Sequence, residues 1–322
     1  MQDGIVFTGV DVGKAELVVA RQPSDRQQPN GQKLRLPNTD SAILKWLRTL
    51  PPGSHIAMES TGRYHQRLAL LAYQAGMKVY VLNARDVHFY AKALGMRGKT
   101  DPSDALVIAR YVAEHHEKLR PWGPGTPEQR RLIEMLRRRA AIERHLSAID
   151  DSLEDVVDLA RQKASMARYA AKLLATIDAK IQALIASDAD LFERQQRLQT
   201  IAGIGPQISA VLAAVLSRNE FANVGAVIAY SGLDPRPNDS GNKRGRRVLS
   251  KRGPAALRKM LWLAAFSASR SKAFKGVYQS IKNRGFSGTE ALVILARKLL
   301  RVAWAVWRTG TPFEPAKVQP AA

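Results

Sequence analysis

The chain contains 322 residues, 45% of them hydrophobic, which is enough for two or three domains with buried cores. It has no cysteine, so disulfide frameworks, thiol catalysis and cysteine-ligated zinc fingers are excluded. Its formal net charge of +22 favours a nucleic acid as partner, because Lys and Arg displace the counterions that condense on phosphates. A ribosome-associated or merely basic protein is the alternative.

The first 122 residues predict a mixed α/β domain. Short apolar segments predict strands at 5–10, 16–20, 33–36, 55–59 and 78–83. Apolar residues at helical spacing predict helices at 41–50, 64–75 and 84–94. Three strands followed by alternating helices and strands favour a mixed sheet with helices packed against it.

Residues 123–192 predict a helical connector. A four-three spacing, typical of a coiled coil or a long helical hairpin, links Ile142, Leu146, Ile149, Leu153, Val156 and Ala160. A second helix continues the apolar pattern at Leu173, Leu174, Ile177, Ile181 and Leu184. Such a stripe usually packs within its own chain, and a dimerisation arm is the alternative.

Residues 193–322 predict a mainly helical domain. Gly203 and Gly205 predict a tight turn whose backbone amides open a helix at Pro206. This arrangement is typical of helix-hairpin-helix motifs that hold a DNA phosphate, although a plain turn between helices has the same pattern. A polar loop at 234–253 is followed by apolar-periodic helices as far as Trp307.

No segment predicts a membrane span or a secretion signal. The most apolar stretch, 291–307, is interrupted by Arg297, Lys298 and Arg301. The first residues, MQDGIVF, lack the basic start and apolar run of a signal peptide. We therefore expect a cytoplasmic protein without a membrane partner.

Four acidic residues stand out by their surroundings. Asp11 and Glu59 each end a predicted apolar strand, where a carboxylate is costly to desolvate without a cation or donor beside it. Asp101 and Asp104 open a predicted helix at i and i+3, so they lie on one face. The four converge only in a fold that makes the two strands neighbours and begins the helix beside them.

Four converging carboxylates repel one another unless hard cations neutralise them. Oxygen-only ligation of this kind suits Mg²⁺ or Mn²⁺, commonly a pair that flanks a phosphate displaced in line. Each residue also has a plain structural explanation. Asp101 ahead of Pro102 is a good helix cap, Asp11 suits a turn, and Glu59 suits an ion pair.

The most basic segment of the chain surrounds Ser240. Its cations are Arg236, Lys243, Arg244, Arg246, Arg247, Lys251 and Arg252. Arg97 and Lys99, ahead of the acidic pair, are further candidates for nucleic-acid binding. A basic loop is by default a phosphate-binding surface, but its cations can also hold a scissile phosphate while the serine attacks it. No Gly-x-Ser-x-Gly motif or histidine triad spacing points to hydrolase chemistry.

Seven motifs carry a resemblance to a known family. Those in the first third are Gly9-Val10-Asp11-Val12-Gly13-Lys14, Met58-Glu59-Ser60-Thr61-Gly62-Arg63-Tyr64 and Arg97-Gly98-Lys99-Thr100-Asp101-Pro102-Ser103-Asp104-Ala105. Those in the last third are Ile201-Ala202-Gly203-Ile204-Gly205, Tyr230-Ser231-Gly232-Leu233-Asp234-Pro235, Asp239-Ser240-Gly241 and Leu249-Ser250-Lys251-Arg252-Gly253. The motifs and their order resemble those of the DEDD transposases of insertion sequences. This is the one-ten family with its eleven-eleven branch, to which Piv-type DNA invertases are related. The similarity covers essentially the whole chain.

The resemblance implies a RuvC-like, ribonuclease H-type domain at 1–122, a coiled-coil connector at 123–192 and a C-terminal transposase domain at 193–322. It implies that the metal ligands are Asp11, Glu59, Asp101 and Asp104, and that Ser240 forms a phosphoserine link to DNA. The reaction would be strand exchange between donor and target DNA, chosen by a structured noncoding bridge RNA, within a homodimer or homotetramer. The loop after Ser240 departs from the family pattern in being shorter and richer in arginine.

Two other functions remain open on the residues alone. A RuvC-like nuclease acting on branched DNA would use the four acids with water and would need no covalent intermediate. A non-catalytic nucleic-acid-binding protein would use Asp101 and Asp104 only as helix caps. A covalent protein–DNA adduct separates the recombinase from both.

Overall fold

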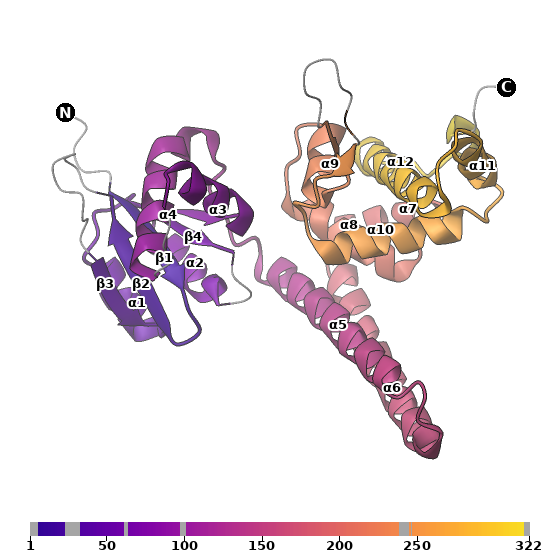
Figure 1. Ribbon diagram of the computed structural model, residues 1–322, viewed down its shortest axis with the longest axis horizontal. Helices are drawn as coiled ribbons and strands as arrows, with labels where there is room; N and C mark the ends of the chain where they lie inside the picture. The colour runs from indigo at the N-terminus through magenta and orange to yellow at the C-terminus, as the bar shows by residue number, and fades with distance from the viewer. Residues whose placement is uncertain are drawn as a thin grey trace. The chain divides into compact units, whose positions relative to one another are not determined.

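The computed structural model describes residues 6–22, 33–60, 64–96, 101–237, 245 and 247–318, with Asp101 and Pro102 described in their backbone only. The chain divides into two compact units, Met1–Gly125 and Thr126–Ala322 (Figure 1). The first unit ends three residues after the expected boundary at 122. The expected connector is grouped with the C-terminal helices in the second unit rather than forming a unit of its own.

A five-stranded mixed sheet is the centre of the first unit. Its strands are β1 (Phe7–Val12), β2 (Glu16–Arg21), β3 (Lys33–Pro37), β4 (His55–Glu59) and β5 (Lys78–Leu82). The strand order is β3-β2-β1-β4-β5. β1 pairs antiparallel with β2, which pairs antiparallel with β3, whereas β4 is parallel to both β1 and β5. The α/β class expected from the alternating pattern is confirmed.

Helices cover both faces of this sheet. They are α1 (Asp40–Leu47), α2 (His65–Gln74), α3 (Ala84–Ala93) and α4 (Asp101–His115), and a short 3₁₀ turn follows at His116–Lys118. Val10 and Val12 of β1 pack with α1 and α2 in one core. Ala57 and Tyr80 pack with α3 and α4 in another core, on the opposite face. The expected strands and helices are all present, with ends displaced by at most three residues.

Helix α4 lies directly on β1 because residue 9 is a glycine. A Cβ at Gly9 would overlap the carbonyl oxygen of Ala105 and the backbone nitrogen of Ala109. Both obstacles are backbone atoms, which cannot rotate away as a side chain can. The missing side chain therefore sets how closely α4 approaches the sheet.

An aromatic cluster holds the other end of α4. The His116 ring, just past the helix, lies 4.9 Å from the Phe7 ring and 5.1 Å from the His55 ring, measured between centroids. His55 is 2% exposed, and the Tyr80 hydroxyl lies 3.4 Å from its Nδ1. Burial, then the nearby Lys78 charge, then His116 lower the pKa of His55 to about 4.

The second unit is almost entirely helical. Its helices are α5 (Pro127–Ser152), α6 (Ala160–Ala186), α7 (Ala189–Gln199), α8 (Pro206–Arg218), α9 (Val224–Ser231), α10 (Ala255–Ala268), α11 (Lys275–Asn283) and α12 (Gly288–Thr309). Two short strands, β6 (Pro235–Arg236) and β7 (Val248–Leu249), pair antiparallel between α9 and α10, and 3₁₀ turns lie at Val157–Leu159 and Pro315–Val318. Small residues of α8, α10 and α12, among them Ala213, Ala264 and Ala303, are fully buried where these helices meet in one core.

Helices α5 and α6 form a hairpin that extends away from the other helices of this unit (Figure 1). Lys163 Nζ, near the start of α6, lies 2.9 Å from Asp150 Oδ1, near the end of α5. The expected seam from Ile142 to Ala160 is wrong in its second half, because α5 ends at Ser152 and the chain turns before α6 begins. The turn is where the apolar spacing crosses from one helix to the next.

No helix of the described segments is long and apolar enough to cross a membrane.

We predict that Gly9→Ala destabilises the first unit by about 3 kcal/mol, the upper part of the usual range for overpacking, because α4 must lift from β1. Chemical denaturation followed by circular dichroism measures this. Gly123→Ala is the matched control, since Gly123 has open space around it and no left-handed φ. Equal stability of the two variants would contradict the role given to Gly9.

We also predict an acid-dependent stability that depends on His55. Since the pKa of His55 in the folded protein is about 4 and its ordinary value is 6.5, the unfolded chain binds the proton first as the pH falls. Stability is therefore lost as the pH falls from 6.5 to about 4, by up to about 3 kcal/mol. His55→Phe, which keeps an aromatic ring beside Phe7, should flatten this loss in thermal melts across that pH range. The same acid loss in wild type and variant would contradict the prediction.

Candidate functional site

Asp11 and Glu59 stand side by side on neighbouring parallel strands. In the β1–β4 ladder Val10 is opposite Met58, so Asp11 and Glu59 are the next residues along the two strands. Adjacent strands lie about 4.8 Å apart, and residues at the same level of parallel strands point to the same face. Both residues are half-buried. Two carboxylates 48 positions apart in sequence are thus brought to the carboxyl edge of the same sheet.

The start of α4 lies at that same edge. Its far end contacts Phe7 and its middle lies on Gly9, so α4 runs antiparallel to β1. Ala105 packs with Val18, the residue opposite Asp11 in the β1–β2 ladder. The first turn of α4 therefore lies beside the level of Asp11.

Two of the candidate acids belong to this first turn. Asp104 is half-buried, immediately before Ala105, and Asp101 is the first residue of the helix. The Asp101 side chain lies outside the described residues. Within the described part of the chain no group of three or more His, Cys, Asp or Glu side chains is spaced to hold a metal ion. The positive end of the α4 dipole offsets part of the repulsion among acids gathered there.

The chemistry of these donors fits one class of cation. Asp11, Glu59 and Asp104 offer carboxylate oxygens, and no thiolate exists in the chain. Hard oxygen donors suit Mg²⁺ or Mn²⁺.

The second unit holds both ends of the Ser240 loop. β6 and β7 pair at its stem, and Ser250 donates from its backbone N–H to the Asp234 carbonyl at 2.9 Å and from its hydroxyl to the Asp234 carboxylate. Gly253 packs so closely on the Tyr230 carbonyl that any Cβ there would overlap it. The motif residues on either side of the loop therefore serve to close its stem.

The basic residues of this segment are only partly described. Arg236, Arg247, Lys251 and Arg252 are exposed, and Arg236 Nε lies 3.9 Å from Asp234 Oδ2. The remaining candidates lie outside the described residues: Ser240, Lys243, Arg244, Arg246, Arg97 and Lys99.

The two glycines before α8 differ in their surroundings. A Cβ at Gly203 would overlap the carbonyl oxygen of Ala264, and its φ of +92° is left-handed, so this glycine lets the turn pack on α10. Gly205 has open space around it and caps α8 in an extended conformation. Gly203 thus has a packing role between helices, which the sequence left as one of two alternatives.

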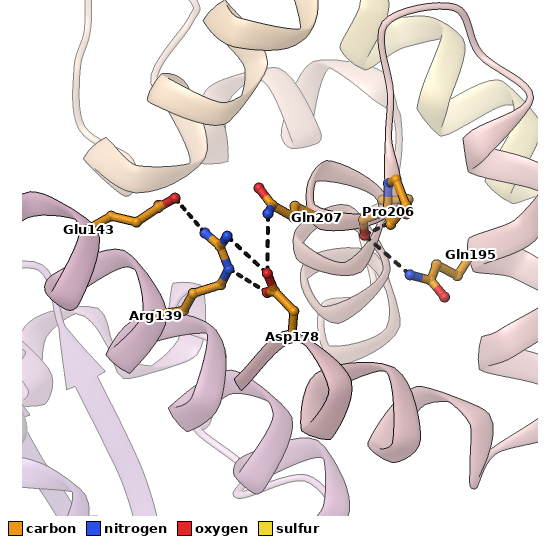
Figure 2. Close-up of polar contacts among 7 residues, drawn as sticks. Arg139, Glu143, Asp178, Gln195, Pro206 and Gln207 are labelled. Carbon is orange, nitrogen blue, oxygen red and sulfur yellow. Dashed lines mark hydrogen bonds and ion pairs between the residues drawn. The ribbon is translucent and has the colours of Figure 1, made fainter. Parts of the chain in front are cut away.

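A buried ion-pair network between α5 and α6 was missed by the sequence analysis. Arg139 is 5% exposed and donates two hydrogen bonds to the Asp178 carboxylate, one of them at 3.1 Å, while its Nη1 lies 2.7 Å from Glu143 Oε1 (Figure 2). Gln207 of α8 donates to Asp178 at 3.3 Å (Figure 2). Arg139 stands in a run of three arginines, a pattern typical of a solvated face, so the sequence carried no signal of its burial.

Comparison with known proteins identifies the family of the chain. The family model DEDD_Tnp_IS110, described as a transposase, matches residues 8–162, and the model described as "Transposase IS116/IS110/IS902 family" matches residues 195–279. The two matches together cover more than two thirds of the chain.

Curated relatives agree with these matches. The pilin gene-inverting protein of Moraxella bovis is 29% identical over 271 residues, which are 81% of this chain and 82% of the relative. The transposase for insertion sequence element IS1328 of Yersinia enterocolitica is 25% identical over 96% of this chain and 98% of its own. An uncharacterized 42 kDa protein of insertion element IS900 in Mycobacterium paratuberculosis is 25% identical over 98% and 99%. The chain belongs to the IS110 family of transposases and is therefore an enzyme of DNA recombination.

Proposed function

We propose that this transposase exchanges DNA strands through a phosphoserine intermediate formed by Ser240, with Asp11, Glu59, Asp101 and Asp104 as ligands of divalent metal. The observation that carries the proposal is the parallel β1–β4 pairing, which sets Asp11 and Glu59 at one level beside the first turn of α4. The strand exchange would act on donor and target DNA. A relative named a pilin gene-inverting protein supports an action on DNA.

The proposed fold of the first unit is RuvC-like, of the ribonuclease H type. Three antiparallel strands followed by two parallel strands, with the acids at the carboxyl edge of β1 and β4, support it. We divide the second unit functionally into a helical connector at 123–192 and a transposase domain at 193–322. The start of the second family match at residue 195 supports the last boundary.

The four carboxylates would hold Mg²⁺ or Mn²⁺, and such cations polarise a phosphoryl oxygen and stabilise the charge of an in-line displacement. The residues of this chain position the metal ligands and the DNA phosphates. Asp11 and Glu59 are fixed by strand pairing, so they need little rearrangement to accept a ligand. The exposed arginines at the stem of the loop, Arg236 and Arg247, suit the phosphates on either side of the reacting one.

The chemical step conserves the number of phosphoester bonds. The Ser240 oxygen bonds to the scissile phosphorus, its proton passes to a base or to solvent, and the deoxyribose oxygen of the broken strand leaves and takes up a proton. A hydroxyl of the partner strand then attacks the phosphoserine and releases the serine. One bond forms as one breaks in each step, so no external energy source is required.

We propose a structured noncoding RNA as the selector of both DNAs. The excess of cations suits contacts to phosphates, which do not distinguish one DNA sequence from another. An RNA that pairs with the DNA would supply that distinction. We further propose a homo-oligomer, a dimer or tetramer, paired through the distal part of the α5–α6 hairpin. Val157 is 84%, Tyr169 75% and Leu173 50% exposed there, and pairing of two copies would bury this apolar surface. Pairing of this kind would let the serine of one copy serve the carboxylates of another.

Ser240→Ala should abolish both recombination and covalent protein–DNA adducts, since it removes the attacking oxygen. Asp11→Asn should stop recombination by removing one charge from the carboxylate set. Denaturing gels of DNA trapped with the enzyme and recombination assays measure both effects. Mixing the two variants should restore part of the activity if sites are shared between copies.

The matched controls are Ser280→Ala and Asp190→Asn, which change exposed residues of α11 and α7. Adducts that persist in Ser240→Ala would refute the nucleophile. Recombination at the wild-type level by that variant, without adducts in either protein, would instead favour a nuclease-type attack by water.

Replacing Arg244, Arg246 and Arg247 together by glutamine should flatten the salt dependence of DNA binding. Each phosphate contact contributes about 0.9 to the slope of log affinity against log salt, so the slope should fall by up to about 3. Fluorescence anisotropy in a salt series measures it. The control removes three exposed cations of the hairpin, Arg144, Arg161 and Lys172. An equal change in the control would mean that total charge, rather than this loop, governs binding.

A further inference from the structure

The second unit contains a cavity of about 500 Å³ between α5, α6, α8 and the start of α10. Its wall is largely aliphatic, and among its side chains are Leu136, Val211, Leu257 and Met260. This volume falls within the range of small-ligand sites, about 300–1,000 Å³. No function described above uses it.

One end of the cavity carries two arginines. Arg218, in the last turn of α8, and Arg137 of α5 both line it, and within the described part of the chain neither makes a hydrogen bond or ion pair to a carboxylate. Burial lowers the pKa of Arg218, Tyr230 opposes this effect, and the Arg137 charge lowers the pKa as well. Two like charges at the mouth of an apolar space form a site that an anion would stabilise.

The other end of the cavity is already neutralised. There Arg139 is buried against Asp178, which also accepts a hydrogen bond from Gln207 at the start of α8 (Figure 2). A carboxylate thus faces the positive end of the α8 dipole. At one end of the cavity the arginine is paired with an acid, whereas the arginines at the other end are not paired with any acid of the described residues. An amphipathic anion would therefore bind with its charged group at the end that holds Arg137 and Arg218.

The cavity also adjoins the stem of the Ser240 loop. Tyr230, which is 37% exposed, and Pro254 both line it. These two residues flank the closed stem, where Gly253 rests on the Tyr230 carbonyl. The ring of Tyr230 stands edge-on against Phe221, with 5.4 Å between centroids, and is thereby held in place beside Arg218.

We propose that this cavity receives one nucleotide turned out of the bound DNA, with its base against the aliphatic wall beside Tyr230 and its phosphate on Arg137 and Arg218. Enzymes that modify a base within a duplex extrude it into a pocket of apolar and aromatic side chains, and this cavity offers such a lining. The inference rests on the proposed function to the extent that the reacting DNA lies at the Ser240 loop. An extruded nucleotide there would kink and unstack the duplex beside the broken strand.

A second copy of the chain fits the cavity less well. It carries the same net charge of +22 and would bring further cations toward Arg137 and Arg218. A phosphodiester supplies the missing negative charge and an apolar ring in a single unit. Charge complementarity therefore favours the nucleotide.

The test uses the full-length protein and a mixed-sequence duplex with 2-aminopurine at a central mismatch. The fluorescence of this base rises on unstacking, and an aliphatic wall does not restore the stacking that quenches it. We expect a several-fold increase on binding to wild type, because a mismatched base costs least to extrude. Arg218→Gln and Val211→Phe should each remove most of that increase, the first by losing the phosphate contact and the second by filling the cavity.

Controls are Arg144→Gln, an equal loss of charge on α5, and Leu263→Trp, a similar gain in size at an exposed site of α10. Both should give the wild-type increase. Circular dichroism verifies folding, and Arg218→Gln remains informative if Val211→Phe fails to fold. Binding seen by anisotropy without a fluorescence increase, or an increase undiminished in the folded variants, overturns the inference and leaves the proposed function standing.

Two further outcomes would also be decisive. No binding of the duplex at any salt concentration would contradict the inference together with the proposed function. Conversion of an oligomer to monomer by Val211→Phe in the absence of DNA would assign the cavity to a second copy and overturn the nucleotide assignment. Sedimentation velocity measures this last outcome.

Discussion

Helix α4 rests on β1 backbone to backbone, because Gly9 offers no Cβ to hold the two apart. This contact fixes both the distance and the direction of α4. With its far end held by the rings of Phe7 and His55, the helix can begin only at the carboxyl edge of the sheet. The placement of two candidate acids thus depends on a residue that takes no part in chemistry.

Much of the first unit could be predicted from its sequence because each element carries a local signal. Strand β4 is a short apolar run and α4 has a clear helical period, and both ends of β4 and the start of α4 were predicted correctly. The pairing of β1 with β4 could not be derived in this way, since register is set by long-range contacts that leave no periodicity in either strand. The sequence predicted that Asp11 and Glu59 lie at the ends of strands. It did not predict that the two residues lie next to each other on adjacent strands.

The second unit shows where periodicity misleads. The apolar spacing from Ile142 to Val156 continues through the point at which α5 ends, since the residues of the turn happen to keep it. Arg139 shows a second limit of the sequence. A buried arginine cannot be told from a solvent-exposed one until its partner is known, and here that partner is Asp178, 39 residues away. The cavity beside Arg218 arises from helix packing and likewise has no signature in sequence.

The stem of the Ser240 loop is held by contacts among the described residues on either side of the loop. Two residues from each strand pair, Ser250 binds Asp234, and Arg258 of α10 donates to the carbonyls of Ser231 and Gly253. None of these contacts involves the residues between Arg236 and Gly245. The helical core therefore anchors both ends of the loop, so that a change in the length or charge of the loop leaves these particular contacts in place.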